Sequence, residues 1–383
     1  YNFGQKPFKF PPPDGFQPLN GANVRPTTVI ARPDQYVGVT TYTGNSSVQS
    51  INVGLKPDFV WIKNRDQNYS HMLLDSVRGD GNTKWLCSDL TREQGVSSGN
   101  GDVVFTSDGF QLRVPSSTNT INGNGDGCVS WSWKAGGSKN TFNVDDVGYA
   151  SAAAAGLTGG SLTITGASVG TKQGFSIIKY TGNATTPETI SHGLLKAPQF
   201  IIGKNTGQDI AWSVYTTAVT AANSLQLNSN GPPTGGTGIW GNTEPTSSVF
   251  TVGNDGNMNG DGQTMIAYCW HDVPGLQKFG TYEGSGNINT GPFVELGFKP
   301  ALLIVKNMDD TEHWYIYDPK RSPSNVAYQS LRASSSGVEE TSNLNTRLDL
   351  LSNGFKLRQG NGPNNANTYI YAAWAEAPTF NLY

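Results

Sequence analysis

Histidine is the first residue type to consider for catalysis or metal binding, and this chain has four. They are His71, His192, His271 and His313, and no HxH, HExxH or Cys/His spacing surrounds any of them. Zinc sites and metalloprotease centres need such groups at defined spacings. The pattern therefore favours structural histidines and predicts neither a metal site nor a catalytic histidine.

Carboxylates could support glycoside cleavage if two of them lay about 5–10 Å apart. The chain contains a threefold internal repeat, and Asp75 and Asp318 stand at matching positions in two of its copies, each eleven residues after the Asn of a Lys-Asn pair. Matching positions in separate copies favour a shared structural role, such as a turn cap, over an active site. No GxSxG elbow is present to expose a nucleophilic serine. We therefore predict that the chain is not an enzyme, with a polysaccharide depolymerase as a weaker hypothesis.

Three glycine-rich segments contain the oxygen-bearing side chains that calcium prefers. They are RGDGN (78–82), NGNGDG (122–127) and NDGNMNGDG (254–262). None has the twelve-residue spacing that ends in Glu. Hairpin turns of Gly and Asn explain all three segments without a metal. The sequence therefore predicts no metal and no cofactor, while calcium binding stays an open alternative.

Two tryptophans lie outside the repeated strands described below. Trp85 and Trp240 fall in segments that vary between the repeat copies. Aromatic faces on loops suit stacking against sugar rings, and loops commonly carry the binding function of a rigid scaffold. We therefore predict Trp85 and Trp240 as residues that bind a host-surface glycan.

The elements that must position these residues form a threefold internal repeat. Each copy begins with a tyrosine strand, VTTYTGN, IIKYTGN or FGTYEGSGN. A Gly, a Pro and an apolar run ending in Lys-Asn follow, and each copy closes on a strand that ends in Trp. The Lys-Asn pair is expected to end a strand and keep its edge soluble, with anionic-glycan binding as an alternative. These lysines and closing tryptophans are Lys63, Lys204, Lys306, Trp133, Trp270 and Trp374.

Short runs rich in Val, Ile, Tyr, Trp, Phe and Thr, separated by Gly, Asn, Asp and Pro, are typical of β-sandwiches and barrels. The prediction is an all-β chain of three tandem jelly-roll or concanavalin-like sandwiches, each of about 100 residues. Segments such as DFVWIK and ALLIVK are continuously apolar, as in centrally buried strands. The predicted divisions are an extended stem (1–36), three modules (37–136, 174–277 and 278–383) and a Gly/Ala/Ser-rich linker (137–173).

Composition limits the classes of function. Charged residues make up 14% of the chain, against about 25% in an average domain. The net charge is −3 and no basic run is present, so nucleic-acid binding is not expected. The sequence contains no run of 18 consecutive apolar residues, so it predicts no membrane-spanning helix. Cys87, Cys128 and Cys269 form no CxxC pair, which favours buried free thiols, although one disulfide within the first module is conceivable.

At this point several segments resemble a known family. NFGQKPF and PPPDGFQPLN resemble the closing strand and exit turn of the SPRY-like domain in marine and cyanobacterial-phage appendage proteins. GLKPDFVWIKNRD, WKAGGSKNTFNVDDVGYASAAAAGL, GFSIIKYTGN and YIYAAWAEAP resemble the repeated concanavalin-like modules that follow that domain. The resemblance implies a bacteriophage virion protein, such as a tail fibre, and supplies no catalytic residues. The chain opens without an initiator Met, which favours a processed chain or a fragment.

The function expected from these observations is that of a structural virion protein contributing to host attachment, located in a tail or capsid appendage. Its modules are expected to string into a fibre, with the second and third as a semi-rigid pair. The expected partners are other virion proteins, further copies of this chain in a homo-oligomer (a trimer) and a host-surface glycan. A lectin-like adhesin is the alternative from the binding class.

Overall fold

The computed structural model describes residues 29–79, 84–96, 103–113, 120–342 and 346–376. These residues form several mostly antiparallel β-sheets, which confirms the all-β prediction. Helical turns in them are short: η1 (Pro33–Gln35), α2 (Thr237–Trp240), α3 (Gly256–Asn259) and η3 (Gly362–Asn364). None of the helices in the described ranges has the length and hydropathy to cross a membrane. Of the predicted stem, residues 1–28 lie outside the described part.

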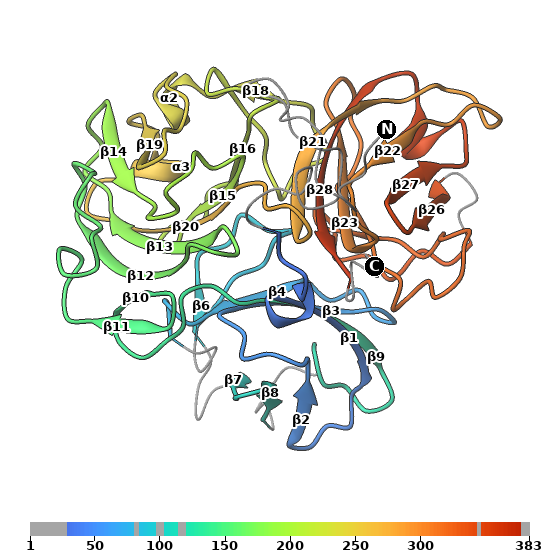
Figure 1. The fold of residues 1–383 in the computed structure, drawn as a ribbon, viewed down its shortest axis with the longest axis horizontal. Coiled ribbons are helices and arrows are strands. Elements are labelled where there is room, and N and C mark those ends of the chain that lie inside the picture. The colour runs from blue at the N-terminus through green and yellow to red at the C-terminus, as the bar shows by residue number, and fades with distance from the viewer. Residues whose placement is uncertain (1–28, 80–83, 97–102, 114–119, 343–345, 377–383) are drawn as a thin grey trace, which may run out of the picture.

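The first lobe, drawn in blue to teal in Figure 1, contains a four-stranded sheet in the order β1-β9-β3-β4. A three-stranded sheet, β2-β8-β7, and the pair β5-β6 complete it. The strands are β1 (Val37–Thr43), β2 (Gln49–Asn52), β3 (Phe59–Asn64), β4 (Met72–Asp75), β5 (Lys84–Trp85), β6 (Gly95–Val96), β7 (Val103–Phe105), β8 (Gly109–Leu112) and β9 (Gly127–Trp133).

The second lobe has a seven-stranded sheet in the order β11-β10-β12-β13-β20-β15-β16, with the pairs β14-β19 and β17-β18. The strands are β10 (Phe142–Val144), β11 (Val147–Tyr149), β12 (Ile164–Gly170), β13 (Phe175–Thr181), β14 (Glu188–Ser191), β15 (Phe200–Asn205), β16 (Ser213–Thr216), β17 (Asn223–Ser224), β18 (Thr234–Gly235), β19 (Val249–Val252) and β20 (Thr264–Trp270).

The third lobe, in orange and red in Figure 1, has a five-stranded sheet, β21-β28-β23-β24-β25, and a three-stranded sheet, β22-β27-β26. The strands are β21 (Gln277–Glu283), β22 (Phe293–Glu295), β23 (Pro300–Asn307), β24 (Tyr315–Tyr317), β25 (Leu331–Arg332), β26 (Leu348–Leu351), β27 (Gly354–Leu357) and β28 (Thr368–Ala375).

The closing tryptophan strand occupies the same place in all three lobes. β9 pairs with β1 and β3, β20 with β13 and β15, and β28 with β21 and β23, all antiparallel. The strand that carries the apolar run is therefore never at the edge of the sheet on this side. An apolar residue at nearly every position of this strand indicates, in addition, that both faces of the sheet are covered.

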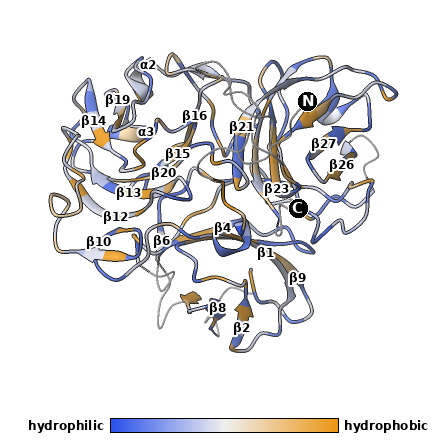
Figure 2. Ribbon diagram, viewed as in Figure 1, coloured by the Kyte–Doolittle hydropathy of each residue, from blue (hydrophilic) through white to orange (hydrophobic). Residues whose placement is uncertain are grey.

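Alternate residues of these strands enter two different cores. On β3, Phe59 and Trp61 belong to a central cluster, whereas Val60 and Ile62 pack between the two sheets of their own lobe. The same division holds on β23, where Leu302 and Ile304 face the centre and Leu303 faces its own lobe. Stretches of hydrophobic ribbon in Figure 2 follow these buried strands. Each large sheet is consequently covered on both faces.

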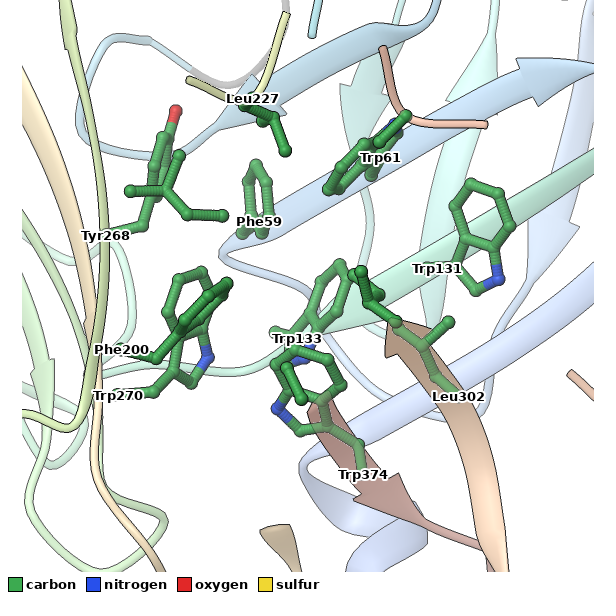
Figure 3. Packing of buried hydrophobic residues seen from close by; sticks show 14 of the residues in the cluster. Phe59, Trp61, Trp131, Trp133, Phe200, Leu227, Tyr268, Trp270, Leu302 and Trp374 are labelled. Carbon is green, nitrogen blue, oxygen red and sulfur yellow. The ribbon is translucent and has the colours of Figure 1, made fainter. Parts of the chain in front are cut away.

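The central cluster joins the three lobes through the closing tryptophans (Figure 3). The ring centroids of Trp133 and Trp374 are 5.4 Å apart, those of Trp270 and Trp374 are 5.9 Å apart, and those of Trp133 and Trp270 are 6.3 Å apart. All three pairs are edge-to-face, which suits the quadrupoles of the rings. Equivalent residues of the repeat therefore meet about a quasi-threefold axis.

The expectation of a linker at residues 137–173 is wrong. This segment contains β10, β11 and β12, and β12 pairs with both β10 and β13 inside the sheet of the second lobe. Ala167 and Val169 of β12 are fully buried. The small residues that suggested flexibility permit close packing instead, because a Cβ on Gly160 would lie 2.6 Å from the Thr189 carbonyl oxygen.

The modules also do not string into a fibre. They surround one core, and the two ends of the described chain meet at one loop between the second and third lobes. The Ile30 amide donates to the Pro274 carbonyl at 3.0 Å, and the Ala375 amide donates to the Leu276 carbonyl at 2.7 Å. The continuous apolar runs explain the outcome, because a chain of separate sandwiches would expose one apolar face of each large sheet to water.

Candidate functional site

The junctions between lobes repeat one hydrogen bond around the axis. Trp212 Nε1 of the second lobe donates to the Cys87 carbonyl of the first at 2.8 Å. Trp314 Nε1 of the third lobe donates to the Gln226 carbonyl of the second at 3.0 Å. Each lobe thus contacts the one before it in the sequence.

His71 closes this ring from the first lobe to the third. Its Nδ1 accepts a hydrogen bond from Trp61 Nε1 at 2.8 Å, so the proton of the neutral ring lies on Nε2. Nε2 is 3.0 Å from the Arg332 carbonyl and donates to it. Burial lowers the pKa of His71 to about 3, which keeps the ring neutral. The three head-to-tail contacts link the second lobe to the first, the third to the second and the first to the third. They therefore form a closed ring and not an open filament.

The matching carboxylates Asp75 and Asp318 are structural, as their positions in the repeat indicated. Asp75 pairs with Arg78 at 2.5 Å and accepts a hydrogen bond from Tyr268 of the second lobe at 2.7 Å. Asp318 pairs with Arg321 at 2.6 Å and accepts from Trp131 of the first lobe at 3.1 Å. Both pairs are buried. Each anion is therefore shared between its own guanidinium and a ring from the neighbouring lobe.

At the junction between the second and third lobes, other residues stand in place of the aspartate, the arginine and the aromatic ring. Counting along the repeat, Thr216 stands at the Asp position, Val219 at the Arg position and Ala372 at the aromatic position. Val219 and Ala372 belong to the central cluster. A buried ion that lost only one partner would be strongly destabilising. The junction between the second and third lobes therefore has an apolar contact where the other two have a buried ion pair.

The repeated lysines do not keep a strand edge soluble, and that expectation is wrong. Lys63, Lys204 and Lys306 are each 0% exposed. Each Nζ donates to the carbonyl of the following Asn and to a loop carbonyl, which for Lys306 is that of Asn230 in the second lobe. Burial lowers the pKa of each lysine to about 8. With no exposed surface, these ammonium groups do not offer a site to an anionic glycan.

Trp240 is also not a glycan platform. It ends the helical turn α2 and is 1% exposed, inside the core of the second lobe. Its ring centroid lies 5.8 Å from that of Tyr215, in an edge-to-face contact. The prediction for Trp240 is wrong because the varying segment that carries it folds inward.

Trp85 is half-buried at the end of β5, where it pairs with Gly95 of β6. The guanidinium of Arg92 lies 5.1 Å from the centroid of its ring. A Cβ placed on Gly95 would come within 2.2 Å of the ring, so the backbone of β6 already covers part of it. Glycan stacking on Trp85 stays a prediction.

Each remaining histidine has at least one ring nitrogen bonded within the fold, while the buried Nε2 of His271 has no partner among the described residues. His192 Nε2 is 3.0 Å from the Thr246 carbonyl, His271 Nδ1 is 2.8 Å from the Asp272 carbonyl, and His313 Nδ1 is 2.9 Å from Ser334 Oγ. Among the residues described, no three His, Cys, Asp or Glu side chains gather as a metal site would require. Cys87, Cys128 and Cys269 are free and buried, as the sequence predicted.

The clearest surface feature is a depression beside the point where the described chain begins. One hollow of about 640 Å³ lies between residues 29–36 and three loops of the second lobe. A second hollow of about 440 Å³ shares Gln35, Tyr36 and Lys172 with the first. We call the two together the entry groove. Its size is within the usual range for sites that bind a ligand or a peptide side chain.

Basic groups line the entry groove, and they differ in whether they are paired. Arg32 bonds Asp34 and Lys134 bonds Asp146, both at 2.7 Å. Lys56, Lys172 and Lys196 are exposed, and no ion pair is found for them within the described ranges. The groove therefore combines an open hollow with three free ammonium groups. Sequence reasoning missed it, because its residues come from distant segments without a common motif.

The comparisons with known proteins agree with a single three-lobed unit. A family model described as a domain of unknown function (DUF7483) matches residues 32–378, which span all three lobes. The search of curated proteins found no match to this chain. The family model covers most of the sequence, and the chain belongs to the DUF7483 family.

Proposed function

We propose that this chain is a structural protein of a bacteriophage virion appendage and contributes to host attachment as one rigid three-lobed head. The observation that carries the proposal is the shared core of three equivalent lobes, with both ends of the described chain at one loop. A body of this kind suits a head or side lobe better than an in-line segment of a fibre. The sequence resemblance to phage appendage proteins supports the virion assignment.

The groups most suited to catalysis have structural roles in the described residues, which supports a non-catalytic function. Asp75 and Asp318 are bound to arginines, and His71 is held neutral between Trp61 and a carbonyl. A general acid or base needs access to a substrate atom within hydrogen-bond reach. Release of reducing ends from host envelope polysaccharide by the purified protein would contradict this part of the proposal.

Antibody labelling of intact virions in the electron microscope tests the proposal directly. We expect label on tail or capsid appendages, and we expect the purified chain to compete with virions for adsorption to host cells. Label that is absent from particles in lysates containing the chain would contradict the virion assignment. Labelled particles without competition would limit the chain to a structural role.

A lectin-like adhesin is the second candidate, and half-buried Trp85 is the observation that favours it. On a glycan array, we expect this function to give binding that Trp85→Ala abolishes. Trp240→Ala is not a suitable test, because that ring is in the core. Array binding that survives Trp85→Ala would reject the Trp85 site.

A homotrimer of this chain is a further part of the proposal. One copy already places three lobes about its own axis, so a trimer would need a surface outside the central core. Light scattering on the purified chain measures the mass of the particle. Three times the chain mass is expected, and a monomer over a wide concentration range would refute the trimer.

A further inference from the structure

We propose that the entry groove is a docking site for an acidic segment of a partner protein that also carries aliphatic side chains. This inference goes beyond the virion assignment and does not depend on it. It rests on three features of the groove: its free ammonium groups, its aliphatic floor and one strained exposed leucine.

The free ammonium groups indicate an anionic occupant. Lys172 lines both hollows, with Lys196 in the first and Lys56 in the second. The neighbouring carboxylates are engaged elsewhere: Asp146 bonds Lys134, and Asp145 accepts from the amide and hydroxyl of Thr171 at 2.8 and 2.5 Å. The five basic side chains of the groove outnumber Asp34, Asp145 and Asp146, which leaves a local net charge of +2 on a protein whose net charge is −3. Carboxylates of a ligand would complete the pairing.

The floor of the first hollow is aliphatic, which favours a peptide over a sugar. Ile30, Leu194, Val273 and Pro274 line it, and its aromatic residues are Tyr36 and His271. Saccharide sites commonly use exposed aromatic rings as platforms. Aliphatic side chains of a peptide would bury apolar area here, while acidic residues reached the lysines at the rim.

Leu195 gives the third observation, which is independent of the other two. It is 74% exposed and lies at φ +62°, a left-handed conformation that is strained for a residue with a Cβ. Its segment GLLKAP (193–198) has six residues where the other lobes have four, GLKP (54–57) and GFKP (297–300). A strained apolar residue, inserted in one lobe and exposed at a hollow, indicates a binding role.

Charge distinguishes a partner from the leading segment of this chain. Residues 1–28 contain Lys6, Lys9 and Arg25 against Asp14, so the segment is itself basic. It would repel the lysines of the groove rather than neutralise them. An acidic segment from another protein is the occupant that fits.

Fluorescence anisotropy on the full chain tests the proposal with a defined probe, a fluorescein-labelled peptide of sequence DLEELLDG. We expect saturable binding that weakens when Ser replaces every Leu and when Asn and Gln replace Asp and Glu. The variants Lys172→Glu and Lys196→Glu should each weaken binding about tenfold or more, since each turns an attraction into a repulsion. Lys139→Glu, an exposed lysine outside the groove, is the matched control and should bind normally.

Leu195→Asn separates a binding role from a structural one. Asn tolerates positive φ, so thermal stability should not fall, while affinity for the peptide should fall several-fold. Absence of saturable binding, or equal binding by the two lysine variants and wild type, would overturn the proposal. A sulfated oligosaccharide that bound as tightly as the peptide would overturn its assignment to a protein segment.

Discussion

The pair Trp61 and His71 offers a sharp test of the equivalence of the three junctions. At the same repeat positions, the second lobe has Ile202 and Trp212, and the third has Ile304 and Trp314. The first lobe therefore carries its indole on β3, whereas the other two lobes carry theirs directly before β16 and β24. Exchanging both residues, Trp61→Ile with His71→Trp, should give the first lobe the packing that the other two already use.

The single substitutions should each be costly. Trp61→Ile leaves a partly empty site in the central core and removes the donor to His71 Nδ1, and we expect a loss of about 2–3 kcal/mol. His71→Trp places a second indole against Trp61 where the ring centroids of Trp61 and His71 are already 5.7 Å apart. Overpacking of this kind costs about 1–3 kcal/mol.

The double variant should lose much less than the two singles together. Its new indole N–H can donate to the Arg332 carbonyl, as Trp212 and Trp314 donate to Cys87 and Gln226. We expect a favourable coupling free energy of about 2 kcal/mol, within the range for residues in contact. Urea unfolding followed by circular dichroism gives each free energy, and an unchanged m-value confirms that the same structure unfolds. Losses that simply add would refute the equivalence of the junctions.

Three further predictions concern buried polar and aromatic groups. Burial lowers the pKa of His71 to about 3 and of His192 to about 4, so below pH 6.5 the unfolded chain binds protons that the folded chain does not. The free energy of unfolding should therefore fall between pH 7 and 5.5, by about 1 kcal/mol for each histidine, and His71→Gln should remove its share of that pH dependence. Burial raises the pKa of Asp58, which changes the free energy of unfolding in the opposite direction. The result that counts against the reasoning is therefore an equal pH dependence in wild type and variant. Tyr268→Phe should lower the free energy of unfolding in urea by about 1.5–3 kcal/mol, since Asp75 loses a charge-assisted hydrogen bond between the first and second lobes. An unchanged free energy would mean that this hydrogen bond does not contribute. Trp240→Ala should lower stability by about 3–5 kcal/mol, as for other buried aromatic rings, and a variant of wild-type stability would contradict its placement in the core.

Local sequence pattern predicted the elements well because each repeat landmark depends on nearby residues. The apolar runs that end at Asn64, Asn205 and Asn307 are strands, and their Trp-terminated partners pair with them in register. The structural role of Asp75 and Asp318 followed from their matching positions. These features depend on strand period and position, which the sequence displays directly.

The arrangement of the lobes depended on long-range packing that single-strand patterns do not specify. The runs DFVWIK and ALLIVK did signal burial on both faces, but not that the second face would meet two other lobes. The strand pattern predicted a solvent-facing Lys63 because it does not reveal that the ammonium group bonds the carbonyls of Asn64, at the end of β3, and of Gln67, in the loop that follows. One more contact is repeated in the three lobes: a leucine pairs, as in a β-ladder, with the strand that follows the Lys-Asn loop, β4, β16 or β24. These leucines are Leu86, Leu225 and Leu331. A search for weak repeats around them could have found this junction.

Differential scanning calorimetry of the full chain tests the central claim most directly. If three lobes share one core around Trp133, Trp270 and Trp374, they should unfold together in one transition, with equal calorimetric and van't Hoff enthalpies. Trp270→Ala should move that whole transition to lower temperature. Two or three separable transitions, or a Trp270→Ala effect confined to one of them, would contradict a single three-lobed body.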